Sequence, residues 1–329
     1  MADIALTEAN ATKDLATRAE VTRRAGRGDA RFHFLTWAAA GLVLLIFIGV
    51  IISLVMGAMP AIRAFGLSFL TSSAWDPTDD EFGGLPSIYG TLVTSVLAMI
   101  VAVPVGIGIA IFLTELCPRM LRRPIGIAIE LLAGIPSIIY GIWGLFVFAP
   151  FLQQHVQPFL IDTFENVPVL STLFAGPPYG IGVLTSALIL AIMVLPFITS
   201  ISRDVFEAVP PVLKEAAYGL GCTTWEVFRK VVLPFTRVGV IGGVMLGLGR
   251  ALGETMAVTF VIGNAHRISG SVLAPGTTIS ATIANEFTEA VGDLYTSSLI
   301  ALGLILFVIT FIVLAIARYM LLRIEKRVG

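Results

Sequence analysis

Residues Glu215–Pro234 read EAAYGLGCTTWEVFRKVVLP and lie between two long apolar stretches of the chain. Two prolines precede this segment, where a helix over residues 214–220 can begin, and Gly221 allows a sharp break. A threonine after the glycine can cap a second helix, which we expect to run from Trp225 and to end at Pro234. The pattern predicts a helix, a glycine turn and a short amphipathic helix between two apolar spans.

The rest of the chain has the composition of an integral membrane protein. Of its 329 residues, 57% are hydrophobic and 13% are charged, and the mean hydropathy is +0.93. These values exceed what the core of a soluble domain requires. Six apolar stretches are long enough to cross a bilayer as helices. They are residues 35–57, 88–113, 125–150, 180–201, 238–262 and 297–318. We therefore predict an all-α membrane protein with six transmembrane helices.

The positions of the basic residues predict the orientation. With the six spans threaded in order, 18 of the 21 lysines and arginines fall on one side, and basic residues in short loops tend to stay in the cytoplasm. Both termini are therefore predicted to be cytoplasmic. We divide the chain into a cytoplasmic segment 1–31, a first transmembrane helix and outer loop 32–87, and a transmembrane domain 88–325 with a cytoplasmic loop 202–237. The first span is expected to remain as an anchor, since residues 1–31 do not resemble a cleavable signal.

The predicted outer loops carry an acidic excess. They hold nine acidic residues against two arginines, Arg63 and Arg267, which gives a formal charge of −7. Such a surface repels a free anion rather than steering it inward. The alternative is that these are ordinary solvated loops.

Several kinds of chemistry are absent from the sequence. The two cysteines and three histidines are scattered, so neither a disulfide nor a metal site is expected. No Gly-Lys pair followed by Ser or Thr occurs, so the chain cannot bind ATP through a P-loop. The spans contain no Ser/His/Asp set or pair of catalytic carboxylates, which argues against a membrane-embedded enzyme. We expect no bound cofactor and no nucleic-acid partner.

The fifth predicted span contains two charges, Arg250 and Glu254, within GLGRALGETMAV (Gly247–Val258). A charge at the centre of a spanning helix costs about 2.5–3.5 kcal/mol, whereas a hydrogen bond between membrane helices returns about 0.6 kcal/mol. We therefore expect both side chains to face protein or a water-filled path. A local or inter-subunit ion pair is the alternative. Glu130, in the third predicted span, is a further candidate for a buried charge, either paired with Arg250 or near the cytoplasmic end.

If the substrate is an oxyanion, as a family resemblance described below implies, the two charges suit its protonated form. An arginine guanidinium presents a fork of donors that matches two oxygens and stays charged, so Arg250 is a candidate ligand in a substrate path. Glu254 can accept a hydrogen bond from phosphate, which carries a proton at neutral pH, but not from sulfate. Our hypothesis is that Glu254 favours the protonated anion.

Glycines and prolines in the spans predict close packing and kinks. Gly243-x3-Gly247 and Gly249-x3-Gly253 have the spacing that lets another helix approach closely. Pro104, Pro136 and Pro196 fall inside the second, third and fourth predicted spans, where neighbouring helices must satisfy the freed carbonyls.

The segment from Glu215 to Pro234 resembles the signature loop of the permease subunits of bacterial ABC importers. Its Glu-Ala-Ala, its glycine and its final Leu-Pro match that loop at every spacing, and Val231 replaces the usual isoleucine. The resemblance implies the MetI-like fold of type I importers and a coupling helix that docks on a separate ATPase. The residues implied in that contact are Glu215, Ala216, Ala217, Gly221 and Trp225. An amphipathic connector lying on the membrane surface is the alternative.

Three further stretches resemble the phosphate permeases of the PstC and PstA type. They are Gly90-Thr91-Leu92 with Thr94-Ser95, Leu132–Ser137 with Tyr140-Gly141, and Gly249–Ala257. The long N-terminal segment and the outer loop around Trp75 favour the PstC branch. The resemblance implies a phosphate importer of the bacterial inner membrane. Its implied partners are a PstA-like homologous permease, a PstB-like ATPase dimer, a PstS-like periplasmic phosphate-binding protein and membrane lipid. A permease for molybdate or sulfate, or a secondary transporter, is the alternative.

Overall fold

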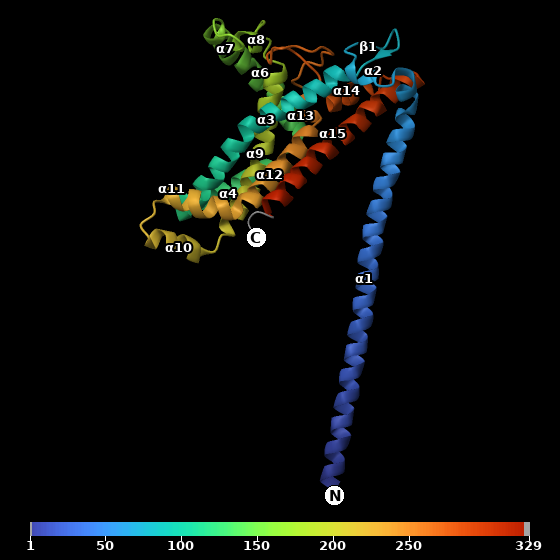
Figure 1. The fold of residues 1–329 in the computed structure, drawn as a ribbon, viewed down its shortest axis with the longest axis vertical. Coiled ribbons are helices and arrows are strands. Elements are labelled where there is room, and N and C mark those ends of the chain that lie inside the picture. Colours follow the sequence, from blue (N-terminus) through green and yellow to red (C-terminus); the bar gives the residue numbers. More distant parts are fainter. Residues whose placement is uncertain (1, 326–329) are drawn as a thin grey trace. The chain divides into compact units, whose positions relative to one another are not determined.

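The computed structural model describes the backbone of residues 2–325 and the side chains of residues 32–323 (Figure 1). The chain divides into two units, with the boundary between Met56 and Gly57. The first unit is the greater part of helix α1 (Ala2–Phe65). From Phe32 to Met56 its side chains are mostly apolar and almost all exposed. A helix that is apolar all round requires lipid or protein around it.

Six helical segments among the described residues are long and apolar enough to cross a membrane, which confirms the prediction of an all-α chain with six spans. They are Phe32–Phe65, Leu85–Leu116, Ser137–Phe164, Val183–Glu207, Thr224–Leu252 and Asp293–Arg323. Four of them begin within four residues of their predicted starts, whereas the third and the fifth are shifted along the chain. The cytoplasmic location of the two termini stays a prediction.

Helix α9 (Val183–Glu207) is at the centre of the second unit. It packs against α3 (Leu85–Ile111), whose last turn continues as the π-helical turn η1 (Phe112–Leu116), and against α12 (Leu233–Leu252). The large apolar side chains that α9 buries completely include Ile189, Leu190, Val194, Ile198 and Phe206. Pro104 and Pro196 lie inside α3 and α9, as predicted.

One of the two predicted glycine repeats forms a close helix contact. A Cβ atom added at Gly243 would lie 2.8 Å from Ile201 of α9, and one at Gly247 would lie 3.0 Å from Ile198. These glycines allow the backbones of α9 and α12 to approach closely. The second repeat was wrongly predicted to form a close helix contact. Gly249 has only ordinary contacts, and Gly253 ends the helix instead.

The third span begins later than predicted. A separate helix, α4 (Arg119–Ala133), ends at Gly134, and α5 (Ser137–Trp143) begins after Pro136. Pro136 therefore separates two helices rather than kinking one, because the residue before a proline is disfavoured in helical conformation. The span continues through η2 (Gly144–Phe148), α6 (Ala149–Phe151), η3 (Leu152–Val156) and α7 (Gln157–Phe164). A short helix, α8 (Leu170–Leu173), follows.

The remaining elements lie at the two ends of the helices in the second unit. Helices α10 (Pro211–Gly219) and α11 (Thr224–Val227) lie at one end (Figure 1). At the opposite end, which we call the outer end, are α2 (Ser68–Thr71), the strands β1 (Trp75–Asp76) and β2 (Glu81–Phe82), and α14 (Ile279–Glu286). The two strands are antiparallel, with Trp75 opposite Phe82. The last helix, α15 (Asp293–Glu325), starts at the outer end.

Candidate functional site

The segment between α9 and α12 has the predicted glycine turn and cap. Gly221 adopts a φ of +84°, a conformation that favours glycine. Thr223 begins α11 with a capping box, because its hydroxyl accepts a hydrogen bond from the Glu226 N–H and the Glu226 carboxylate accepts one from the Thr223 N–H. The turn that connects α10 with α11 is therefore fixed by local sequence.

The prediction that the second helix ends at Pro234 was wrong. Helix α11 continues through the π-helical turn η4 (Phe228–Val232) into α12, so one helical segment runs from Thr224 to Leu252. In η4 the Leu233 N–H donates to the carbonyl of Phe228, five residues earlier. This wider turn shifts the hydrogen bonds just before Pro234, which has no N–H to donate.

An ion pair that the sequence did not indicate anchors α10 to the transmembrane helices. The Lys214 ammonium lies 2.6 Å from the Glu115 carboxylate at the end of the second span, and only 7% of the Glu115 side chain is exposed. Removing one partner of a buried pair is strongly destabilising. The two residues are 99 positions apart in the chain, so no local pattern could reveal this contact.

The residues implied in coupling form a surface with prominent apolar side chains. Ala217 is buried against the rest of the chain, whereas Glu215, Ala216 and Gly221 are exposed. Trp225 is 62% exposed and Leu220, beside the glycine, is 86% exposed. Large apolar side chains that are exposed together are typical of a contact site for another protein or for the membrane surface.

Arg250 and Glu254 do not share a helix, although the sequence suggested that they lie one turn apart. Arg250 is in the last turn of α12, and its guanidinium carbon lies 4.5 Å from the centre of the Phe197 ring. The helix ends at Leu252. Glu254 then precedes α13 (Met256–Thr259), and its carboxylate accepts a hydrogen bond of 3.2 Å from the Ala257 N–H. Among the described residues, Arg250 and Glu254 form no ion pair with each other.

Helix α13, which follows the break after α12, packs against α5, which follows the break between α4 and the third span. A Cβ atom at Gly141 of α5 would lie 2.9 Å from the Met256 carbonyl and 3.2 Å from the Ala257 Cα. Helices α5 and α13, each of which starts after an interruption, are thus in direct contact. Non-helical backbone at membrane depth is tolerated where it is buried in protein or lines a water-filled path.

Glu130, a candidate from the sequence for a buried charge, is neither buried nor paired with Arg250 in the structure. Its side chain is 48% exposed on α4, and its carboxylate lies 2.7 Å from the guanidinium of Arg203 on α9. Arg203 also contacts Asp204. Glu130 lies on α4, a separate helix that precedes the third span.

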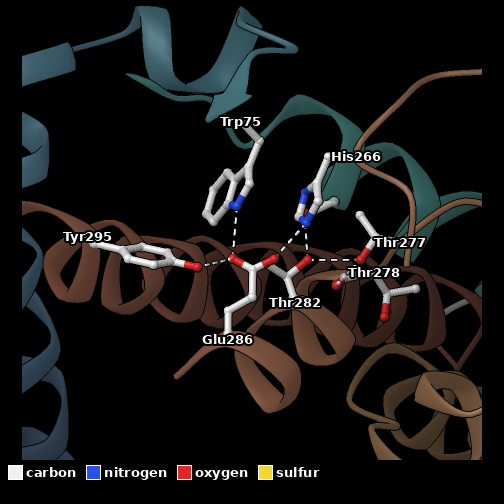
Figure 2. A network of polar contacts seen from close by, with 8 residues as sticks. Trp75, His266, Thr277, Thr278, Thr282, Glu286 and Tyr295 are labelled. Carbon is white, nitrogen blue, oxygen red and sulfur yellow. Dashed lines mark hydrogen bonds and ion pairs between the residues drawn. The ribbon is translucent and has the colours of Figure 1, made fainter. Parts of the chain in front are cut away.

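A polar network at the outer end joins four parts of the fold, namely β1, the loop after α13, α14 and α15 (Figure 2). The Glu286 carboxylate accepts hydrogen bonds from the Trp75 indole N–H at 2.8 Å and from the Tyr295 hydroxyl at 2.8 Å, and it pairs with the His266 ring at 2.7 Å. The rings of Trp75 and His266 stack 5.0 Å apart. Burial raises the pKa of Glu286, but the bonds to His266, Tyr295 and Trp75 outweigh it, so the pKa lies below its usual value. Sequence reasoning missed this network.

Comparison with known proteins identifies relatives over nearly the whole chain. Residues 102–326 match the family described as binding-protein-dependent transport system inner membrane component. A Mesorhizobium japonicum protein named phosphate transport system permease protein PstC is 71% identical over 313 residues, which cover 95% of this chain and 96% of the relative. A protein of the same name from Pasteurella multocida is 58% identical, with 87% and 89% of the two chains covered. The resemblance to PstC proteins is thereby confirmed.

Solved structures of ABC importers share the fold. A chain of a bacterial alginate ABC transporter, solved in complex with an alginate-bound periplasmic protein, superposes with a TM-score of 0.55 at 17% identity, covering 91% of this chain and 97% of that one. A chain of the inward-facing MetNI methionine ABC transporter superposes with a TM-score of 0.53 at 15% identity, covering 72% and 94%. The predicted MetI-like fold is confirmed.

Proposed function

The chain belongs to the family of binding-protein-dependent transport system inner membrane components, and from this membership we propose that it is a permease subunit of an ATP-driven phosphate importer. The proposed substrate is inferred from the high identity, over nearly the whole chain, to proteins named phosphate transport system permease protein PstC. In this proposal the chain forms half of the translocation path, performs no chemistry and binds no cofactor. ATP is hydrolysed on a separate subunit.

The surface around Trp225 is the proposed contact with the ATPase. The exposure of Trp225 and Leu220 supports this role, because aromatic side chains in the centre of an interface commonly contribute most of its binding energy. The ion pair between Lys214 and Glu115 ties α10 to the end of the second span. A force on this surface would therefore reach two transmembrane helices, α12 directly and the α3–η1 segment through the ion pair.

The continuous helix from Thr224 to Leu252 offers a mechanism for that coupling. Trp225 and Arg250 are 25 residues apart on it, which corresponds to about 37 Å at 1.5 Å per residue. When ATP binding closes the ATPase dimer, a shift of Trp225 would move the end of α12 that carries Arg250. In this way the translocation path would switch from being open to the inner side to being open to the outer side.

Arg250 and Glu254 are the proposed substrate contacts. The interruption after α12 exposes backbone between two helices, an arrangement in which transporters bind substrates near the membrane centre. Arg250 has no acidic partner among the described residues, and its guanidinium can donate to two oxygens of an anion. One oxygen of Glu254 caps α13. Its other oxygen remains to accept the proton that distinguishes hydrogen phosphate from sulfate.

The proposed partners are a PstA-like second permease, a PstB-like ATPase pair and a PstS-like periplasmic phosphate-binding protein. Co-purification of the chain with these proteins, followed by an ATPase assay in liposomes, tests the assembly. We expect ATP hydrolysis to rise when the phosphate-loaded binding protein is added and to stay low with the empty protein. Stimulation by a sulfate- or molybdate-loaded protein instead would reassign the substrate.

A further inference from the structure

A polar pocket of about 520 Å³ opens at the outer end, between the loop before α9 and the loop after α13. It is lined by Thr172 of α8, by Tyr179 from the first loop, and by Arg267, Ser269 and Ser271 from the second. A recess of about 10 Å³, no larger than one water requires, shares Arg267 and both serines with the pocket and extends toward Gly90 at the start of α3. The pocket therefore has room for a small anion, and the recess does not.

Arg267 is the only charged residue in the lining of this pocket and of the recess. Its guanidinium forms no ion pair or hydrogen bond within residues 32–323, and it is exposed. The hydroxyls of Thr172 and Tyr179 likewise have no hydrogen-bond partner in that part of the chain. The pocket thus holds one uncompensated positive charge beside two free hydroxyl groups.

The acidic side chain bound to the residue beside Arg267 is already engaged. His266, next to Arg267 in the chain, is bound to Glu286, whose carboxylate is already engaged by Trp75 and Tyr295 (Figure 2). The acidic group adjacent to this loop is therefore committed elsewhere. Ser271 is also occupied, since it donates to the Ala175 carbonyl and joins the two loops that form the pocket.

We propose that the Arg267 pocket binds the oxyanion substrate at the outer end, before it reaches Arg250. The proposal rests on the proposed function and adds a second, outer binding site to it. A guanidinium with adjacent hydroxyls matches the oxygens of phosphate in charge and in hydrogen bonding. On an outer surface that is otherwise acidic, such a pocket offers the substrate a local attraction after the delivering protein releases it.

Phosphorus NMR of the purified permease–ATPase complex in nanodiscs, without the binding protein, tests this inference. The phosphorus resonance of inorganic phosphate broadens when the anion exchanges rapidly between solution and the pocket, and this broadening gives the affinity. Arg267→Gln should weaken phosphate affinity at least tenfold, because a charge-assisted hydrogen bond is worth more than the ~1.4 kcal/mol of one decade. Arg63→Gln is the matched control. It removes the other arginine of the predicted outer loops, which is exposed and outside the pocket, and it should leave the affinity unchanged.

Equal phosphate broadening by the native complex and by Arg267→Gln would overturn the inference, with Arg250→Gln measured beside them to identify the remaining site. If the same variant also loses affinity for the phosphate-free binding protein, Arg267 binds a carboxylate of that protein instead. Uptake by the native, complete transporter separates this failure from failure of the proposed function. A complex that imports phosphate normally retains that function even if Arg267 contributes nothing.

Discussion

Replacing Gly243 with alanine tests how closely α12 packs on α9. The new Cβ atom would lie 2.8 Å from Ile201 Cγ2 and 3.1 Å from its Cβ, well inside the 3.5–4.0 Å of an optimal carbon–carbon contact. Isoleucine is branched at Cβ and cannot rotate away within a helix. Overpacking of this kind costs about 1–3 kcal/mol, whereas alanine gains about 1 kcal/mol over glycine in a helix. We expect a net loss of about 0–2 kcal/mol.

The neighbouring glycine is a matched control. A Cβ atom at Gly242 would have no neighbour within 4 Å, so Gly242→Ala should be stabilising by about 0.5–1 kcal/mol through helix propensity alone. The two variants should therefore differ by about 1–3 kcal/mol. Thermal unfolding of the purified subunit in detergent measures this difference. Equal midpoints, or a lower midpoint for Gly242→Ala, would refute the close packing of α12 on α9 at Gly243.

Three further predictions concern the site and the outer network. Glu254→Gln should weaken the preference for phosphate over sulfate about tenfold, as measured by competition in uptake. With the amide oxygen capping α13, the NH2 group that replaces the free oxygen donates and cannot accept the substrate's proton; unchanged discrimination would refute that role. Trp225→Ala should weaken association with the ATPase by about 2 kcal/mol or more and leave the subunit's melting temperature nearly unchanged, which co-purification and calorimetry check. The pKa of Glu286 lies below its ordinary value of 4.5, so the ionised carboxylate stabilises the fold above pH 4.5. This stability should be lost as the pH falls through the lowered pKa, and Glu286→Gln should remove that pH dependence of the melting temperature.

Local sequence predicted those features that depend on neighbouring residues. The apolar stretches identified six spans, and the glycine and threonine of the segment between α9 and α12 predicted its turn and its cap. Pro234 was misinterpreted because a π-helical turn, which has no clear sequence signal, accommodates it. Glu254 was placed on the helix because Gly253 was interpreted as a packing residue, whereas it ends α12.

Contacts between distant segments could not be predicted from the sequence. Lys214 and Glu115 are each ordinary charges near a membrane boundary, and only the fold brings them together. The same holds for Trp75 and Glu286, which are 211 residues apart. The network at the outer end therefore appears only in the structure, although its tryptophan lies in the outer loop that favoured the PstC branch.

ATP-dependent uptake of radiolabelled phosphate into proteoliposomes tests the central claim most directly. The vesicles contain the chain with its partner permease, the binding protein, and either an active ATPase or one that binds ATP without hydrolysing it. We predict sustained uptake with the active ATPase and none with the inactive one. Continued uptake with the inactive ATPase would contradict the account, because the chain would then transport phosphate without the coupling that Trp225 and the long helix to Leu252 are proposed to provide.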